Sequence, residues 1–325
     1  MTAITRTASS GWAAAVLGML VLGSALAGQQ LSKVERLGYP AGTRLLIVHA
    51  DDMGMAHAQD AASFAALEAG AASSGSVLVP APWAPEAIAW ASQHPDADIG
   101  IHLALTAEWP VLRWGGVLSR AEVPSLYDEH GFLPATTAEV ARHARADEVE
   151  RELRAQLARA RELGLRPTHL DTHMAGVMVT PEIFAAYLRV ARENRLPAMI
   201  PAELLAQPQL LGVAPGLAAL VKPDEVLVDH YVMAMGNLAP DQWAAFYTNV
   251  IQSLEPGTIT QLIVHLGYDD AEMRAVTAGQ QPYGAAWRQR DLDFFTSPAA
   301  KKLLAEHGVR LTTWRELSKL LPAQS

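Results

Sequence analysis

The sequence predicts a single-domain α/β fold, either a (β/α) barrel or a distorted relative of it with fewer strands. Apolar segments of strand length alternate with helical segments along most of the 325 residues. Such alternation is typical of a parallel sheet, open or closed into a barrel. Polar side chains come directly after several of the apolar segments. This is expected of a fold in which reactive residues gather at the carboxyl ends of the strands.

Apolar runs and helix-ending glycines mark the first half of this alternation. A strand is predicted over 44–48 (Arg-Leu-Leu-Ile-Val), whose apolar residues after Arg44 are typical of a strand that is buried on both faces. A helix is predicted over 57–69, and Gly70 ends it. The elements expected next are a strand over 76–80, a helix over 85–92 and a strand over 98–105.

The second half begins with a strongly amphipathic segment, 147–163, which carries an apolar stripe on one face and ends at Gly164. Thr180 and Pro181 suit the N-cap and the first position of a helix over 181–194. The remaining expected elements are strands over 168–173, 226–231, 259–266 and 310–313, and a helix over 292–306. Residues 106–134 form a long loop, which in a compact domain is usually functional.

The first residues are predicted to lie outside this fold. Arg6 is the only charged residue before an uncharged apolar run over 12–22, and Ala25-Leu26-Ala27 fits a small-residue cleavage site. The apolar run is short for a membrane span, so residues 1–27 are interpreted as a signal peptide. Residues 28–325 are then the catalytic domain, exported to the periplasm or secreted. An uncleaved N-terminal anchor is the alternative, and it would also place the domain outside.

Composition limits the chemistry further. The formal net charge of −9 argues against a broad nucleic-acid-binding surface. The chain has no cysteine, which excludes disulfides and thiolate metal sites. A bound metal would therefore be held by histidine and carboxylate side chains. The sequence leaves the oligomeric state open.

Three separate segments supply such side chains. Residues 49–52 (His-Ala-Asp-Asp) come after the first strand, His102 lies in a later strand, and residues 169–173 read His-Leu-Asp-Thr-His. Imidazoles and carboxylates without cysteine are typical of a catalytic divalent-metal site that activates water. A fourth strand ends at His265.

Each segment also has a structural alternative. The adjacent Asp51 and Asp52 would suit the N-cap of the next helix. His102 and His265 would suit buried strand histidines. The alternation of His169, Asp171 and His173 places all three on one face, which could also be a polar strand edge. The presence of all the segments in one chain favours the metal site.

Three of these motifs, in order and spacing, resemble the YdjC/ChbG-like carbohydrate deacetylases. They are the segments over 46–54, 100–106 and 167–173, and the loop segment 125–132 and Gln156 fit as well. The resemblance runs from about residue 44 to residue 180 and is weaker after that, where residues 263–265 (Ile-Val-His) look like a late histidine motif.

This resemblance implies a barrel-like fold, a divalent metal (Mg²⁺ or Zn²⁺) and removal of acetyl groups from N-acetylated sugars or oligosaccharides. Asp52, His102 and His173 match the metal ligands, and Asp51 matches the catalytic base. His265 is our candidate acid for the leaving amine. Departures from the family pattern occur at Met174, Leu266 and 200–203. Trp83, Trp109 and Trp114 are candidates for stacking on sugar rings, with core packing as the alternative.

Two other functions fit the same residues. A different metal-dependent hydrolase, such as a NodB-like polysaccharide deacetylase, would use His169 and His173, four residues apart, as joint ligands. An exported carbohydrate-binding protein without catalysis is the non-enzymatic alternative. The intact Asp51, Asp52, His102 and His173 argue against it.

Overall fold

A curled sheet of seven parallel strands is the centre of the structure, a computed structural model that describes residues 31–210, 212–279 and 282–322. The expected signal peptide, residues 1–27, lies outside the described residues. Strand order is β4-β3-β2-β1-β6-β5, with β7 also beside β1. The strands are β1 (Arg44–Met53), β2 (Ser74–Val77), β3 (Ile99–Leu103), β4 (Leu170–Thr172), β5 (His230–Met233), β6 (Ile259–Val264) and β7 (Val309–Leu311).

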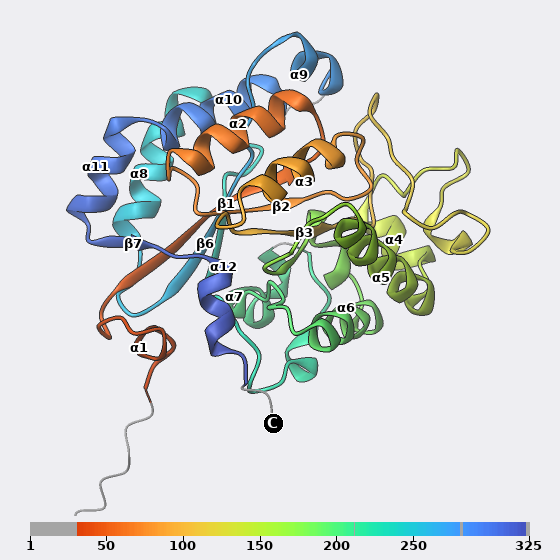
Figure 1. The fold of residues 1–325 in the computed structure, drawn as a ribbon, viewed down its shortest axis with the longest axis horizontal. Helices are drawn as coiled ribbons and strands as arrows, with labels where there is room; N and C mark the ends of the chain where they lie inside the picture. Colours follow the sequence, from red (N-terminus) through yellow and green to blue (C-terminus); the bar gives the residue numbers. More distant parts are fainter. Residues whose placement is uncertain (1–30, 211, 280–281, 323–325) are drawn as a thin grey trace, which may run out of the picture. The chain divides into compact units, whose positions relative to one another are not determined.

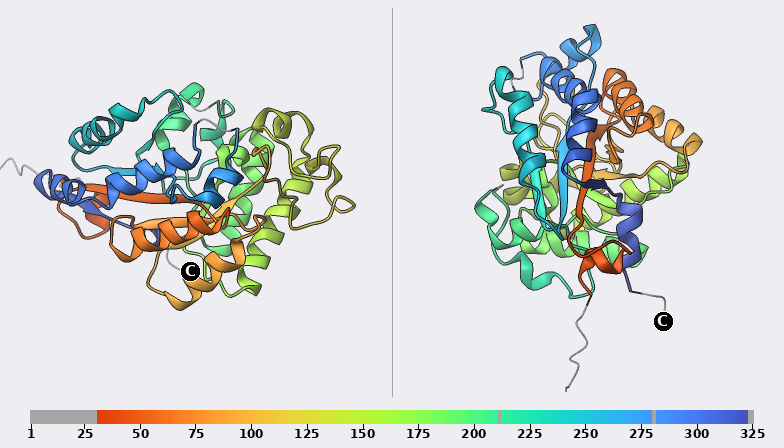
Figure 2. Two further views of the ribbon diagram at one scale, coloured as in Figure 1. Left: turned by 90° about the horizontal axis from the view of Figure 1, so that it is seen from above. Right: turned by 90° about the vertical axis from the view of Figure 1, so that its left-hand side faces the viewer.

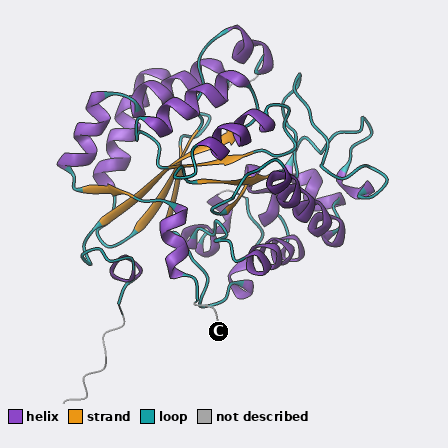
Figure 3. Cartoon of the chain, viewed as in Figure 1, coloured by secondary structure: helices purple, strands orange, loops and turns teal. Residues whose placement is uncertain are grey.

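The sheet curls into a half-barrel, which confirms the predicted α/β, barrel-like fold. Isolated bridges join Leu170 to Ala198 and Pro201 to Val228, and they extend the pairing from β4 towards β5. Figure 3 shows the strands converging at the centre, surrounded by helices. Because every pairing is parallel, the carboxyl ends of all strands meet at one edge.

Helices cover the sheet in two groups, and Figures 1 and 2 show them from three directions. Beside β1 and β6 lie α2, α8, α10 and α11, while α5 and α6 pack together near β3 and β4. The helices are α1 (Lys33–Arg36), α2 (His57–Glu68), α3 (Ala84–Gln93), α4 (Thr137–His143), α5 (Ala146–Glu162), α6 (Pro181–Asn194), α7 (Ala202–Ala206), α8 (Trp243–Ser253), α9 (Ala271–Val276), α10 (Ala285–Phe295), α11 (Pro298–Glu306) and α12 (Trp314–Leu317). Within the described residues, no helix is long and apolar enough to cross a membrane.

Strand β1 separates two apolar cores. Leu46 and Val48 point to the side of α8 and α10, whereas Leu45 and Ile47 point into the half-barrel. Alternation places His49 on the inner face too, where its imidazole contacts Ser74 and Ser76 of β2. The interior of the half-barrel therefore becomes polar towards the carboxyl end of β1.

Several predicted strand boundaries were wrong. The strand expected over 76–80 is β2 (Ser74–Val77), because its inward positions carry serines and Pro80 has no N–H to donate. The strand expected over 226–231 is β5 (His230–Met233), since pairing with β6 begins only at His230. Strand β1 extends beyond the expected 44–48 to Met53.

Helix predictions failed mainly where the helix is short or its apolar patterning is weak. The single helix expected over 292–306 is two helices, because Ser297 caps α11 and Pro298 interrupts the hydrogen-bond pattern of α10. The helices that were not predicted are α1, α4, α7, α8, α9 and α12. By contrast, α2, α3, α5 and α6 lie within one residue of their expected positions.

The long loop between β3 and α4 is held in place by buried polar contacts. Glu152 of α5 accepts hydrogen bonds from the backbone N–H groups of Val117 and Leu118. Trp114 donates through Nε1 to the carbonyl of Thr106. Gln156 donates to the carbonyl of Ala104 and accepts from its N–H. The loop therefore has a defined path over the carboxyl end of β3.

Gly100 in β3 provides a test of the packing inside the half-barrel. A Cβ at this position would lie 2.5 Å from ring atoms of His169. We expect Gly100→Ala to lower the free energy of unfolding by about 1–3 kcal/mol, because the buried imidazole has no room to move. Thermal unfolding measures the change. Gly42→Ala is the control, since nothing lies within 4 Å of its Cβ position. Equal melting temperatures for the two variants would contradict the close packing of Gly100 against His169.

Candidate active site

A cavity of about 270 Å³ opens at the carboxyl edge of the sheet. Residues from four strands, β1, β3, β4 and β5, and from the connections after β3, β4 and β6 line it, which brings together segments far apart in the sequence. The lining residues are Asp51, Asp52, His102, Glu108, Trp109, Thr172, His173, Met174, Ala175, Tyr231, Met233, His265 and Tyr283. All five residues proposed from the sequence for catalysis or metal binding are among them.

Asp51 and Asp52 both face this cavity, although adjacent residues of a regular strand point to opposite sides. The pairing of β1 with β2 shifts register between Ala50 and Met53, and Asp52 has a left-handed backbone with φ of 64°. This irregularity turns the second carboxylate towards the first. The N-cap of α2 is Ala56, so the alternative role of the aspartates as a helix cap is wrong.

Asp52, His102 and His173 form a group whose ligand atoms lie within 4.8 Å of one another. Asp52 Oδ1 is 3.6 Å from His102 Nε2 and 3.3 Å from His173 Nδ1. All three side chains are buried, and Asp52 Oδ1 has no hydrogen-bond partner within the structure. A buried acceptor facing two imidazole nitrogens fits a metal ion, so these residues can hold one.

Arg288 of α10 holds the other oxygen of Asp52. Its guanidinium is fully buried, donates to Asp52 Oδ2 at 2.9 Å and to the carbonyl of Tyr283, and also contacts Gln59. The guanidinium carbon lies 5.4 Å from the centroid of the Trp109 ring, within the range of a cation–π contact. Because Oδ2 is committed to Arg288, Oδ1 is the oxygen left for a ligand.

The charges around Asp52 and His173 stabilise their ionised forms. Burial alone would raise the pKa of Asp52, but His173 and Arg288 outweigh it and hold the pKa well below its usual range. Burial likewise opposes protonation of His173, yet Glu108 and Asp52 raise its pKa to about 10. In the absence of a metal, His173 is therefore an imidazolium at neutral pH.

Asp51 has a different environment. Burial raises its pKa, and the carboxylates of Asp171 and Asp52 raise it further, well above the usual range. His49 Nε2 lies 3.3 Å from Asp51 Oδ1 and 3.0 Å from Asp171 Oδ2, between the two carboxylates. A cation bound nearby would lower the pKa of Asp51 and favour its carboxylate form.

His169 lies outside the group formed by Asp52, His102 and His173. Its ligand atom groups instead with His49 and Asp171, and its ring stacks on Trp314 at 5.3 Å. Burial lowers its pKa to about 3. Asp171 faces His102 Nδ1 at 3.4 Å, the nitrogen opposite the one that faces Asp52. His169, Asp171 and His173 are all buried, so the alternative of a solvent-facing strand edge is wrong.

His265 enters the cavity from the end of β6. Its Nε2 is 3.8 Å from Asp52 Oδ2, its backbone N–H donates to Asp291, and its ring lies 5.1 Å from Tyr283. Burial lowers the pKa of His265 to about 3, so its imidazole is neutral at pH 7. The structure therefore places this histidine beside the candidate metal ligands and outside their group.

Backbone strain is concentrated around the cavity. Among the described residues, five non-glycine positions have positive φ, and four of them line it: Asp52, Met174, Ala175 and Tyr283. Such conformations cost free energy and persist at functional sites, where the surrounding structure imposes them. Met174 and Ala175 come directly after His173, so this strain accompanies the turn of the chain after β4.

The tryptophans proposed for ring stacking have separate positions. Trp109 lines the cavity, Trp114 is buried 6.2 Å from His173, and Trp83 is 40% exposed beside His57. Only Trp109 of the three forms part of the cavity wall.

Sequence reasoning missed Glu108, Tyr231, Tyr283 and Arg288. Each comes from a segment without a ligand-rich motif, and only the fold brings them to the cavity. The length of the loop over 106–134 was the one signal that pointed towards Glu108.

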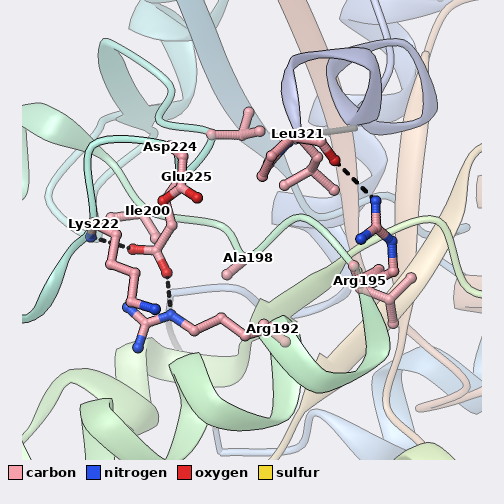
Figure 4. Close-up of a pocket in the computed structure, with 12 residues that line it drawn as sticks. Arg192, Arg195, Ala198, Ile200, Lys222, Asp224, Glu225 and Leu321 are labelled. Atoms are coloured by element: carbon pink, nitrogen blue, oxygen red, sulfur yellow. Dashed lines mark hydrogen bonds and ion pairs between the residues drawn. The ribbon is translucent and has the colours of Figure 1, made fainter. Parts of the chain in front are cut away.

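A second cavity, of about 210 Å³, lies beside α6 and does not carry this chemistry (Figure 4). Arg192 pairs with Glu225, and Arg195 donates to the carbonyl of Pro322. Lys222 donates its backbone N–H to Glu225. The lining of this second cavity includes none of the histidines and aspartates grouped around the first one.

Comparisons with known proteins find similar chains over most of this sequence. A carbohydrate deacetylase of Thermus thermophilus is 35% identical over 298 residues, covering 89% of this chain and 98% of that protein. A chitooligosaccharide deacetylase of Serratia marcescens is 29% identical, covering 84% and 99%. The crystal structure of an Enterococcus faecalis protein with a proposed role in cellobiose-phosphate cleavage superposes with a TM-score of 0.68 at 23% identity, covering 85% and 99%. The family profile described as YdjC-like protein matches residues 45–306. The chain belongs to the YdjC-like protein family.

Proposed function

We propose that this protein is a metal-dependent carbohydrate deacetylase that hydrolyses the acetamido group of N-acetylated sugars or oligosaccharides. The observation that carries the proposal is the buried group of Asp52, His102 and His173 with a further carboxyl, Asp51, beside it in one cavity. Relatives of 35% and 29% identity are named for carbohydrate and chitooligosaccharide deacetylation.

The ligand set supports a divalent metal, Mg²⁺ or Zn²⁺. Two imidazoles and one carboxylate favour Zn²⁺, because Mg²⁺ prefers oxygen ligands and keeps several waters. Three protein ligands leave a position for water or substrate, as catalytic zinc sites require. When bound, such an ion would polarise the acetyl carbonyl and lower the pKa of a water molecule.

Asp51 is the proposed general base. It lines the cavity next to Asp52, and its Oδ1 makes no hydrogen bond among the described residues, so this oxygen can accept a proton from water. Hydrolysis of the amide requires this carboxyl to be ionised. The positive charge of a metal at the neighbouring ligands favours that form.

His265 is the proposed acid for the leaving amine. Since its imidazole is neutral at pH 7, the proton that it delivers to the amine is the one that Asp51 takes from the attacking water. Its Nε2 lies 3.8 Å from Asp52 Oδ2, on the side of the cavity that Tyr283 also lines. An amine leaves only after protonation, and a histidine at this position can donate the proton.

The walls of the cavity support an uncharged sugar ring as the bound group. Trp109, Tyr231 and Tyr283 provide aromatic faces, and Met174 and Met233 provide flexible apolar ones. Among the described lining residues there is no lysine or arginine to bind a phosphate. We further propose that the protein is exported, which rests on the signal peptide predicted for residues 1–27.

Removal of the metal-binding carboxylate tests the ligand set. We expect Asp52→Asn to lose most of the bound metal, because the amide oxygen carries no charge to bind a cation. Metal content after dialysis is the measurement, and circular dichroism checks that the variant folds. Asp96→Asn, an exposed position, is the control. Metal content equal to that of the wild type would refute Asp52 as a ligand.

Removal of the base tests the chemical step. We expect Asp51→Asn to reduce acetate release from acetylated chitooligosaccharides by about 100-fold or more while metal content is retained. The reason is that the amide cannot accept the proton of the attacking water. Unchanged acetate release in this variant would refute Asp51 as the general base.

Metal binding is expected to depend on pH. His173 has a pKa raised to about 10 by Glu108 and Asp52, so it must lose a proton before it can bind a metal. Affinity should therefore rise with pH, by about tenfold per unit for one displaced proton, from neutral pH up to that pKa. Calorimetric titration at several pH values, in buffers of different ionisation enthalpy, measures both affinity and proton release. An affinity independent of pH over this range would contradict the prediction.

A further inference from the structure

We propose that Glu108 is a positioning residue of the metal site. Its carboxylate accepts the Nε2 proton of His173 and so presents Nδ1 of the same ring to the metal. The inference rests on the metal-dependent function proposed above. It assigns a task to a residue of the long loop that no sequence motif marks.

The two nitrogens of His173 face different partners. Nε2 is 2.9 Å from Glu108 Oε2, whereas Nδ1 is 3.3 Å from Asp52 Oδ1. A neutral imidazole carries one proton, and a carboxylate acceptor at Nε2 places it there. The lone pair of Nδ1 is then directed at Asp52 Oδ1, on the side where the ligand atoms converge.

His102 also lies between two carboxylates, but with its nitrogens reversed and, among the described residues, without a hydrogen bond at Nδ1. Its Nδ1 faces Asp171 Oδ2 at 3.4 Å, and its Nε2 faces Asp52 Oδ1 at 3.6 Å. Each candidate ligand histidine thus has a carboxylate on the nitrogen that points away from Asp52. Such carboxylates fix the tautomer and the orientation of metal-binding histidines.

The two carboxylates are supported differently. Asp171 is in β4 and buried, whereas the Glu108 side chain is 20% exposed and comes from the loop after β3. That loop is fixed on both sides of Glu108, since Ala107 donates its N–H to Pro134 and Trp109 packs against Arg288. His173 is the last residue before two left-handed positions, so the strand does not hold its ring from the C-terminal side. Glu108 supplies that restraint.

Zinc affinity of the purified full-length protein tests the proposal. We expect Glu108→Ala to weaken Zn²⁺ binding by about 10–100-fold, as loss of such a partner typically does. Glu108→Gln keeps an oxygen acceptor for Nε2–H and should stay within about threefold of the wild type. Affinities are compared at their limiting values at high pH, so that competition by protons does not enter. Glu129→Ala, a highly exposed position in the same loop, is the matched control.

Two further measurements separate positioning from a merely structural role. At neutral pH the metal-free Glu108→Ala protein should melt below the wild type, because Glu108 pairs with the protonated His173. At a pH above the pKa of His173 the two melting temperatures should match, and saturating Zn²⁺ should restore kcat to within a few fold. A lowered metal-free melting temperature at that high pH, with unchanged Zn²⁺ affinity, would overturn the proposal. If the wild type itself binds no Zn²⁺, the proposed metal-dependent function fails. If the wild type binds and Glu108→Ala binds equally well, only the role of Glu108 is refuted.

Discussion

The buried ion pair between Asp52 and Arg288 is the interaction on which the rest of the site depends. Arg288 comes from α10 near the end of the chain, and Asp52 lies at the end of the first strand. Removing one partner of such a pair leaves an unpaired buried charge, which costs about 3–5 kcal/mol. The pair therefore joins α10 to β1, and through Gln59 and Trp109 it also fixes α2 and the loop after β3.

The ion pair with Arg288 also determines which oxygen of Asp52 faces the cavity. With one oxygen of Asp52 held by Arg288, the other faces His102 and His173, and both imidazoles are backed by carboxylates. Asp51 lies among carboxylates, and burial and its neighbours Asp171 and Asp52 raise its pKa. A metal ion at the neighbouring ligands would favour the ionised form of Asp51 and so offset the effect of burial and of Asp171 and Asp52 on its pKa.

The sequence predicted the parts of the fold and site that depend on residues close together in the chain. The apolar run before Asp51 predicted a buried strand, and the amphipathic pattern with Gly164 predicted α5 to within one residue. It also predicted that Asp51, Asp52, His102, His173 and His265 lie at strand ends, because residue order fixes which side chains come after each strand. Helices such as α8, and the split between α10 and α11 at Pro298, escaped prediction because long-range packing or a single cap decides them.

By itself, then, the sequence determined the residue types and their positions along strands, which is enough to indicate metal-assisted hydrolysis and the family. Only the tertiary structure decided which atoms face each other. Contacts between distant segments determine the left-handed backbone at Asp52 and which nitrogen of His173 faces it. They also bring Glu108 and Arg288 to the site. Periodicity reports the face of a strand on which a residue lies, but not the partner that the curled sheet brings to it.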